Sequence, residues 1–182
     1  MRFKSMPYLG GIIVTCLALL CPAAIAAEPG PFAGFNGQWI GTGKIKLANG
    51  AEERVRCRAV YTEGDGGRAL QQSFRCASDS YNFELRSDLE SHGNQITGNW
   101  NETTRNVGGT VSGRGKSGKI EVRVNNPSFS ADLTLVSQGD VQTVTIRSEG
   151  TPFTGASMSL RRSGRSATDR ERQAPSAVVG GR

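Results

Sequence analysis

The feature that most constrains this chain is a pattern typical of a β-hairpin in residues 52–79. Apolar and small side chains occupy every second position of two runs, which are Val55, Cys57, Ala59 and Tyr61, then Leu70, Gln72, Phe74 and Cys76. A Gly-rich stretch joins the runs, and this combination predicts two antiparallel strands. A turn centred between Gly66 and Gly67 places Cys57 opposite Cys76 on the apolar face, at a separation that suits a disulfide.

The N-terminal residues predict the compartment. Arg2 and Lys4 precede an apolar run at 9–20, and Ala24-Ile25-Ala26 is a small-x-small cleavage site. This order is typical of a secretory signal peptide, which we place at 1–26. The alternative is an uncleaved anchor, but the run is short for a membrane span. Leu20 precedes Cys21, and this order does not suit a lipoprotein. We therefore expect a periplasmic or secreted protein with no transmembrane segment after cleavage.

Cleavage changes the cysteine count. The chain has four cysteines, and only Cys57 and Cys76 follow the signal peptide. An even count in an exported chain favours a bridge, which stabilises by about 3 kcal/mol for a loop of this length. The alternative is two buried free thiols.

The remaining chain is expected to hold one domain. We expect a linker at 27–34, a β-domain at 35–162 and a disordered tail at 163–182, which lacks aromatic residues. The net charge of +6 includes the signal peptide and the tail. Together with export, this modest charge does not suggest a nucleic-acid partner, and we expect a monomer.

The domain itself shows further alternating runs separated by turn residues, from Trp39 to Leu160, and no helical periodicity. This pattern predicts an all-β fold, an antiparallel up-and-down meander of about 8–10 strands. Closure into a small barrel removes the two exposed sheet edges, and a sandwich is the alternative.

Gly37-Gln38-Trp39 on the first strand and Arg161 or Arg162 on the last resemble the calycin superfamily, which includes lipocalins and avidins. The resemblance implies a barrel in which Trp39 packs against Arg161 or Arg162 at the closed end. The second lipocalin motif, the helical lid of fatty-acid-binding proteins and the biotin-binding residues of avidin have no match. The general layout also resembles small proteins exported by Gram-negative bacteria.

Two groups of residues are candidates for binding. Side chains on the apolar face are candidates to line a pocket for a small apolar ligand, or else they fill the interior. These are Tyr61, Gln72, Phe74, Tyr81, Phe83, Trp100 and Phe129. On the opposite face, Arg54, Arg56, Arg58 and Arg75 form a stripe that is a candidate for an anionic surface or protein, or else is simply solvated.

Nothing in the sequence favours catalysis. The chain has one histidine, His92, in a predicted turn without a nucleophile beside it, and no His/Cys cluster has metal-ligand spacing. We therefore expect no catalytic residue, metal or cofactor. The sequence predicts an exported binding module that is not an enzyme. An inhibitor of a secreted enzyme and an enzyme of unfamiliar type are the alternatives.

Overall fold

The computed structural model describes residues 28–149 and 153–164, and the expected signal peptide and most of the expected tail lie outside them. The described residues form ten strands and one short 3-10 helix, η1 (Asp65–Gly67). The strands are β1 (Gly37–Leu47), β2 (Glu52–Gly64), β3 (Ala69–Ala77), β4 (Asn82–His92), β5 (Gln95–Glu102), β6 (Val107–Lys116), β7 (Lys119–Asn125), β8 (Ser130–Gln138), β9 (Val141–Glu149) and β10 (Phe153–Arg162).

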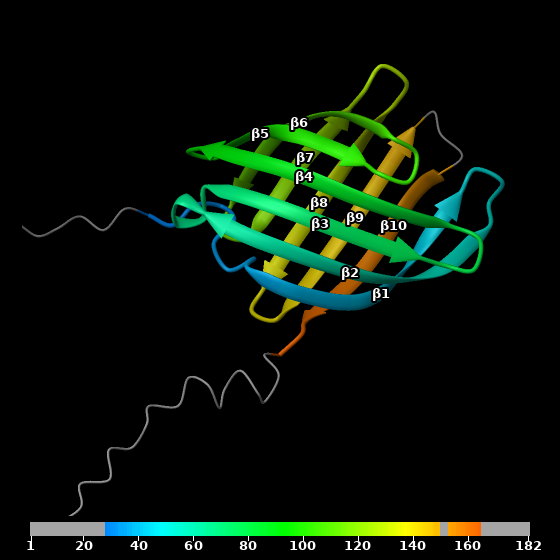
Figure 1. Cartoon of the computed structure of the whole chain (residues 1–182), viewed down its shortest axis with the longest axis horizontal. Helices are drawn as coiled ribbons and strands as arrows, with labels where there is room; N and C mark the ends of the chain where they lie inside the picture. Colours follow the sequence, from blue (N-terminus) through cyan, green and yellow to red (C-terminus); the bar gives the residue numbers. More distant parts are fainter. Residues whose placement is uncertain (1–27, 150–152, 165–182) are drawn as a thin grey trace, which may run out of the picture.

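Every strand pairs antiparallel with its sequence neighbours, and β1 also pairs with β10, which closes the barrel. In Figure 1 strands β2–β4 lie in front of β7–β10, so the meander wraps fully around its interior. The predicted all-β, up-and-down barrel is confirmed, and because it is closed no strand is left with an unpaired edge.

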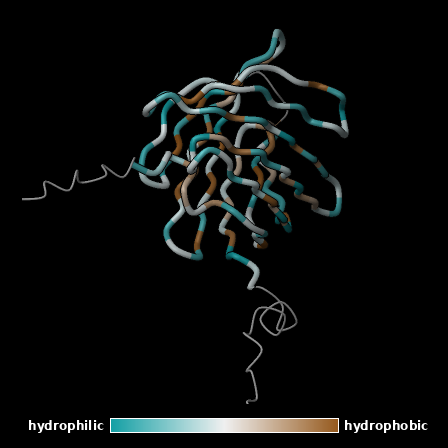
Figure 2. The backbone as a smooth tube through the Cα atoms, turned by 60° about the vertical axis from the view of Figure 1, so that its left-hand side comes forward, coloured by the Kyte–Doolittle hydropathy of each residue, from teal (hydrophilic) through white to brown (hydrophobic). Residues whose placement is uncertain are grey.

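Alternation along the strands separates the core from the surface. In β2, Val55, Cys57, Ala59 and Tyr61 are buried, and the residues between them are exposed. Apolar and polar residues alternate along the tube in Figure 2 for the same reason. Successive side chains of a strand point to opposite faces, so one apolar set fills the barrel and one polar set covers it.

The hairpin of β2 and β3 has the predicted register. Cys57 pairs with Cys76 and Ala59 pairs with Phe74, and the two sulfurs form a disulfide. Met158 of β10 lies against this bridge, with its Sδ 3.4 Å from the Sγ of Cys57. A Cβ on Gly43 would lie 2.4 Å from the Cγ of Met158, so β1 needs a glycine where Met158 crosses it.

One end of the barrel is covered by the residues that precede β1. Phe32 and Phe35 are fully buried, and Phe35 packs edge-on against Tyr61 with ring centroids 5.7 Å apart. The backbone N–H of Phe32 donates to the carbonyl of Gly67 at 3.0 Å. Residues 28–34, expected to be a linker, therefore contribute to the packed end of the barrel, because Phe32 has apolar surface to bury there.

At the same end, Trp39 and Arg162 lie together. The indole N–H of Trp39 donates to the carbonyl of Phe35 at 2.8 Å, and the guanidinium of Arg162 lies 4.3 Å from the centroid of the Trp39 ring. Arg162 also donates to the carbonyls of Gly34 and Asn36. Arg161, the other candidate of the resemblance, points to the outer face. Arg162 thus ties the last strand to the segment that covers this end.

Candidate functional site

The opposite end of the barrel carries half-buried aromatic side chains. Tyr81, in the connection between β3 and β4, stacks on Phe153 with ring centroids 6.3 Å apart. Phe129, just before β8, packs against Trp100, whose buried indole N–H has no hydrogen-bond partner in the described chain. We call this end of the barrel the mouth, because Tyr81, Phe129 and Phe153 keep part of their apolar surface in solvent there.

The interior below this mouth contains an apolar cavity of about 60 Å³. Aliphatic side chains of β7, β8 and β9 form one wall, and Leu133, Leu135 and Ile146 of that wall are only partly buried although they point inward. The lining residues with polar side-chain groups are Tyr61 and Gln72. The side chains therefore do not fill the barrel completely, and the space they leave is almost wholly apolar.

The candidate lining residues separate into two groups. Tyr61, Gln72, Phe74 and Phe83 line the cavity, while Tyr81, Trp100 and Phe129 lie outside its lining. The sequence analysis missed the aliphatic lining residues, which include Leu85, Val122, Leu133, Leu135 and Ile146. Their alternation along the strands was visible in the sequence, but the candidates chosen from it were six aromatic residues and Gln72.

The polar groups inside the barrel are few and mostly paired. The hydroxyl of Tyr61 donates to Oε1 of Gln142 at 2.8 Å, and Gln142 is fully buried. Its amide nitrogen Nε2 has no partner among the described residues. Burial raises the pKa of Tyr61 far above its usual value, so this phenol stays neutral at physiological pH. The interior thus offers neutral hydrogen-bonding groups and no charge from Tyr61.

Glu102 is a buried carboxylate at the end of β5, near the mouth. It accepts hydrogen bonds from the backbone N–H groups of Glu84, Thr104 and Arg105, at 2.8 to 3.1 Å, and from the Thr104 hydroxyl. Burial alone would raise the pKa of Glu102, but these hydrogen bonds hold it below its usual value. Since its oxygens are used by the turn that follows β5, the role of Glu102 is structural.

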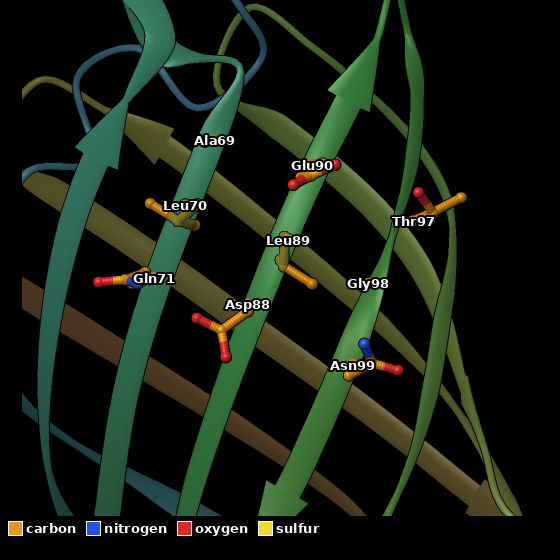
Figure 3. A pocket seen from close by; sticks show the side chains of 9 residues that line it. All are labelled: Ala69, Leu70, Gln71, Asp88, Leu89, Glu90, Thr97, Gly98 and Asn99. Carbon is orange, nitrogen blue, oxygen red and sulfur yellow. The ribbon is translucent and has the colours of Figure 1, made fainter.

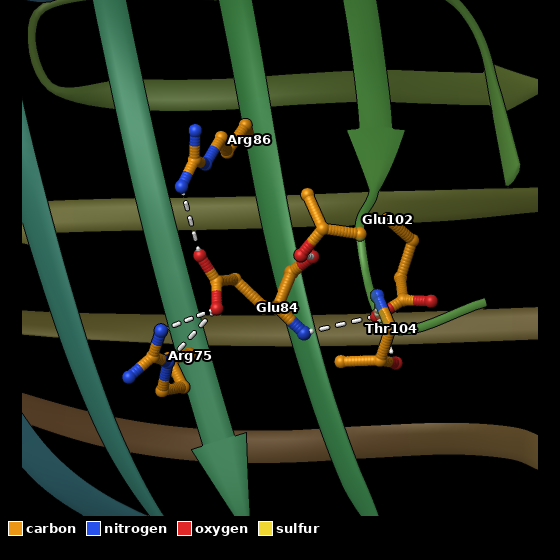
Figure 4. A network of polar contacts seen from close by, with 6 residues as sticks. Arg75, Glu84, Arg86, Glu102 and Thr104 are labelled. Carbon is orange, nitrogen blue, oxygen red and sulfur yellow. Dashed lines mark hydrogen bonds and ion pairs between the residues drawn. The ribbon is translucent and has the colours of Figure 1, made fainter. Parts of the chain in front are cut away.

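The arginine stripe lies on the outer face of the barrel. Arg54, Arg56 and Arg58 are exposed on β2, and Arg75 lies across from Arg58. Arg75 is ion-paired with Glu84, which also binds Arg86 (Figure 4). Both cations lower the pKa of Glu84, and the hydrogen bond from Arg75 has the largest effect. The charge of Arg75 is therefore compensated within the fold.

A second hollow lies on the outside, over β3, β4 and β5, with a volume of about 440 Å³ (Figure 3). Its polar lining residues Gln71, Asp88, Glu90, Thr97 and Asn99 are all exposed. Because these side chains are solvated and the hollow is broad and open, it lacks the desolvated polar groups that give a ligand site its specificity. We assign it no binding role despite its larger volume.

His92 is exposed at the end of β4. Within residues 28–149 and 153–164, no three His, Cys, Asp or Glu side chains come close enough together to hold a metal ion. Over the same residues, no helix has the length and apolar character needed to cross a membrane.

Neither a family model nor a curated protein sequence matches this chain. Two solved structures share its fold. Rv2717c from M. tuberculosis has a TM-score of 0.55 and 13% identity, and the match covers 72% of this chain and 94% of that one. The S-type phycobiliprotein lyase CpeS from Guillardia theta has a TM-score of 0.50 and 12% identity, with 74% and 91% covered. At such identities the likeness concerns the fold alone, and it agrees with a calycin-like barrel.

Proposed function

We propose that this protein is an exported binding module that holds a slender apolar ligand inside its barrel. The observation that carries the proposal is the incomplete filling of the interior, where Leu133, Leu135 and Ile146 point inward and keep exposed surface. Burial of apolar surface stabilises a complex by roughly 25 cal/mol per Å² before the costs of binding are subtracted. An apolar ligand that covers these side chains therefore has a favourable driving force.

The size of the cavity restricts the ligand. Pockets for drug-sized molecules usually measure about 300–1,000 Å³, whereas this cavity measures about 60 Å³. A broad ring system does not fit without displacing side chains. A single hydrocarbon chain is narrower and suits a cavity of this size better. We therefore place the end of an alkyl or acyl chain among the aliphatic residues.

One polar group is available to orient such a ligand. Gln72 lines the cavity on β3 and is only partly buried, so its amide is accessible from the interior. The neutral Gln72 amide suits a hydroxyl, ester or amide group of the ligand better than a buried charge, which needs a countercharge.

Calorimetric titration with fatty alcohols of increasing chain length tests this function. We expect saturable binding of one chain per protein and loss of binding in Leu133→Trp, which fills the cavity with a larger side chain. The control Thr134→Trp adds the same side chain one position away, on the outer face of β8, and should bind normally. If the natural protein binds no chain, or if Leu133→Trp binds as well as Thr134→Trp, the interior is a packed core and the proposal is wrong.

The export part of the proposal rests on residues 1–26, which lie outside the described residues. N-terminal sequencing of the protein from its native source tests this part separately. A mature chain that begins at Ala27 or Glu28 is expected, and a chain that retains Met1 in the cytoplasm would contradict it.

A further inference from the structure

A continuous outer surface of the barrel combines unpaired cations with exposed aliphatic side chains. We call it the cationic face and define it by Arg54, Arg56, Arg58, Arg161, Ile40, Val60 and Val141. We propose that the cationic face docks on a membrane surface that contains anionic phospholipids. This inference is independent of the ligand proposed for the interior.

The strand register places these residues side by side. Val141 of β9 pairs with Arg161 of β10, Arg161 pairs with Ile40 of β1, and Ile40 pairs with Arg58 of β2. These four residues form one row across four adjacent strands. Val60 is the next outward residue after Arg58 on β2, while Arg56 and Arg54 continue the face in the other direction. Outward residues of one strand lie about 7 Å apart, so the seven side chains form one compact surface.

The aliphatic members of this face are exceptional in the fold. Ile40, Val60 and Val141 are 47%, 40% and 37% exposed, and they are the large hydrophobic residues that the described chain leaves exposed. Single exposed aliphatic residues are ordinary, but here each of the three lies next to Arg58 or Arg161. Clustered exposed apolar residues mark an interaction surface.

The four arginines of this face, Arg54, Arg56, Arg58 and Arg161, form no ion pair with any of the described residues. The neighbouring cations differ, because Lys44 and Lys46 bind Glu52 while Arg75 and Arg86 bind Glu84. The cationic face is therefore positive without compensation, and its partner must supply the negative charge.

The shape of the face favours a membrane over an acidic protein segment. Because the barrel is closed, β1 and β2 have partners on both sides and an extended peptide cannot be added as a further strand. Neither of the two cavities described above includes a residue of this face, so neither of them offers a protein partner an anchoring hollow beside these arginines. A lipid surface needs neither, since phosphates bind the arginines and the short aliphatic groups reach the headgroup boundary.

Co-sedimentation of the mature protein with vesicles tests the proposal. We expect binding to vesicles of phosphatidylglycerol and phosphatidylcholine, weakened by salt, and little binding to phosphatidylcholine alone. Arg56→Ala with Arg58→Ala should reduce the partition coefficient by about tenfold or more, since each arginine near the surface contributes severalfold. Ile40→Ser with Val60→Ser should reduce it by about threefold or more, since apolar area also contributes.

A matched control separates the cationic face from net charge. Arg114→Ala with Arg123→Ala removes the same charge from β6 and β7, and β7 lies five strands from β2 in this ten-stranded barrel. This control should retain binding within about twofold, and Arg56→Lys with Arg58→Lys should retain most of it because the charge is kept. Unchanged melting temperatures will show that all variants fold.

Three outcomes would overturn the proposal. The first is no binding to anionic vesicles at low salt. The second is an equal loss of binding in the Arg114 and Arg123 control, which would mean that only net charge matters. The third is retention on immobilised polyglutamate without binding to vesicles, which would assign the cationic face to an acidic protein instead.

Discussion

Glu102 is a single residue that connects a strand of the barrel to a neighbouring turn. Its carboxylate accepts hydrogen bonds from the backbone N–H groups of Glu84 and Thr104 (Figure 4). It also accepts one from the backbone N–H of Arg105, so it links the start of β4 to the turn that follows β5. A carboxylate with several such donors is held in its charged form. The pKa of Glu102 consequently lies below its ordinary value of 4.5 in the folded protein.

The pH dependence of stability follows from this pKa. Because the folded pKa lies below the unfolded one, the charged carboxylate stabilises the fold above about pH 4.5, and this contribution disappears as the pH falls through the folded pKa. Glu102→Gln should lower the free energy of unfolding by about 1–3 kcal/mol at pH 7, since glutamine is uncharged and offers these part-buried N–H donors one acceptor oxygen in place of two.

Urea unfolding at pH 7 and at pH 3 measures this effect. The difference between the natural protein and Glu102→Gln should shrink in acid, whereas Glu90→Gln on the exposed face should change little at either pH. A constant difference at both pH values would show that the charge of Glu102 does not stabilise the fold.

The pairing of Arg75 shows what the sequence could and could not predict about a single residue. The positions of Arg58 and Arg75 across from each other followed from the turn in their own hairpin. The pairing of Arg75 with Glu84 depends on the register between β3 and β4, across a connection with no Gly-rich turn to set it. For that reason the sequence could not predict that Arg75 is ion-paired, unlike the other arginines of the stripe.

Among the elements, the β2–β3 hairpin is the one most completely predicted from sequence. Two period-two runs, a turn with glycines at positive φ and two cysteines all agree on one register. A one-residue slip would place the cysteines on opposite faces, so the register has little freedom.

Removal of the bridge should destabilise this element and the barrel with it. Cys57→Ala with Cys76→Ala should lower the free energy of unfolding by about 2–5 kcal/mol, because the bridge closes a loop with a sequence separation of 19. Urea unfolding of the variant, compared with the natural protein before and after reduction, measures this. An unchanged unfolding midpoint in both cases would contradict the expected stabilisation.

The segment before β1 is the element that the sequence did not reveal. Residues 28–36 contain no repeating apolar pattern, so a strand-based analysis treats most of them as a connection. Their order comes instead from two aromatic side chains that enter the end of the barrel and from backbone hydrogen bonds to Gly66 and Gly67. Such long-range docking leaves no local periodicity.

This segment should contribute strongly to stability. Phe32→Ala is expected to lower the free energy of unfolding by about 3–5 kcal/mol, because it removes a fully buried ring. Phe153→Ala, at the opposite end, removes a ring that is only partly buried and should cost clearly less. Equal losses in thermal or urea unfolding would show that Phe32 does not cover a packed end.

At the scale of the whole molecule, the two ends of the barrel differ, and so do its apolar inner face and its polar outer face. One end is covered by Phe32, Phe35 and the contacts of Arg162, and the other carries the half-buried rings. The alternation in the sequence was sufficient to predict the strands and the apolar interior, whereas closure was expected because it removes the sheet edges, with a sandwich as the alternative. It could not predict how much of that interior stays empty, since a cavity depends on how side chains from distant strands meet.

The aromatic side chains of the apolar face divide between mutual packing and the lining of the cavity. Trp100 and Phe129 pack against each other near the mouth, outside the cavity lining, whereas Phe74 and Phe83 lie beside the space that remains. The aliphatic wall of β8 and β9 leaves that space because its side chains are smaller than the aromatic rings on β3 and β4.

The most direct test of the central claim is a crystal structure of the protein grown with a fatty alcohol that carries bromine at the end of its chain. We expect an anomalous bromine peak inside the barrel, next to Leu133, Leu135 and Ile146. A protein that binds the chain in solution but shows bromine only on its outer surface, or a barrel interior that stays empty at saturating ligand, would contradict it.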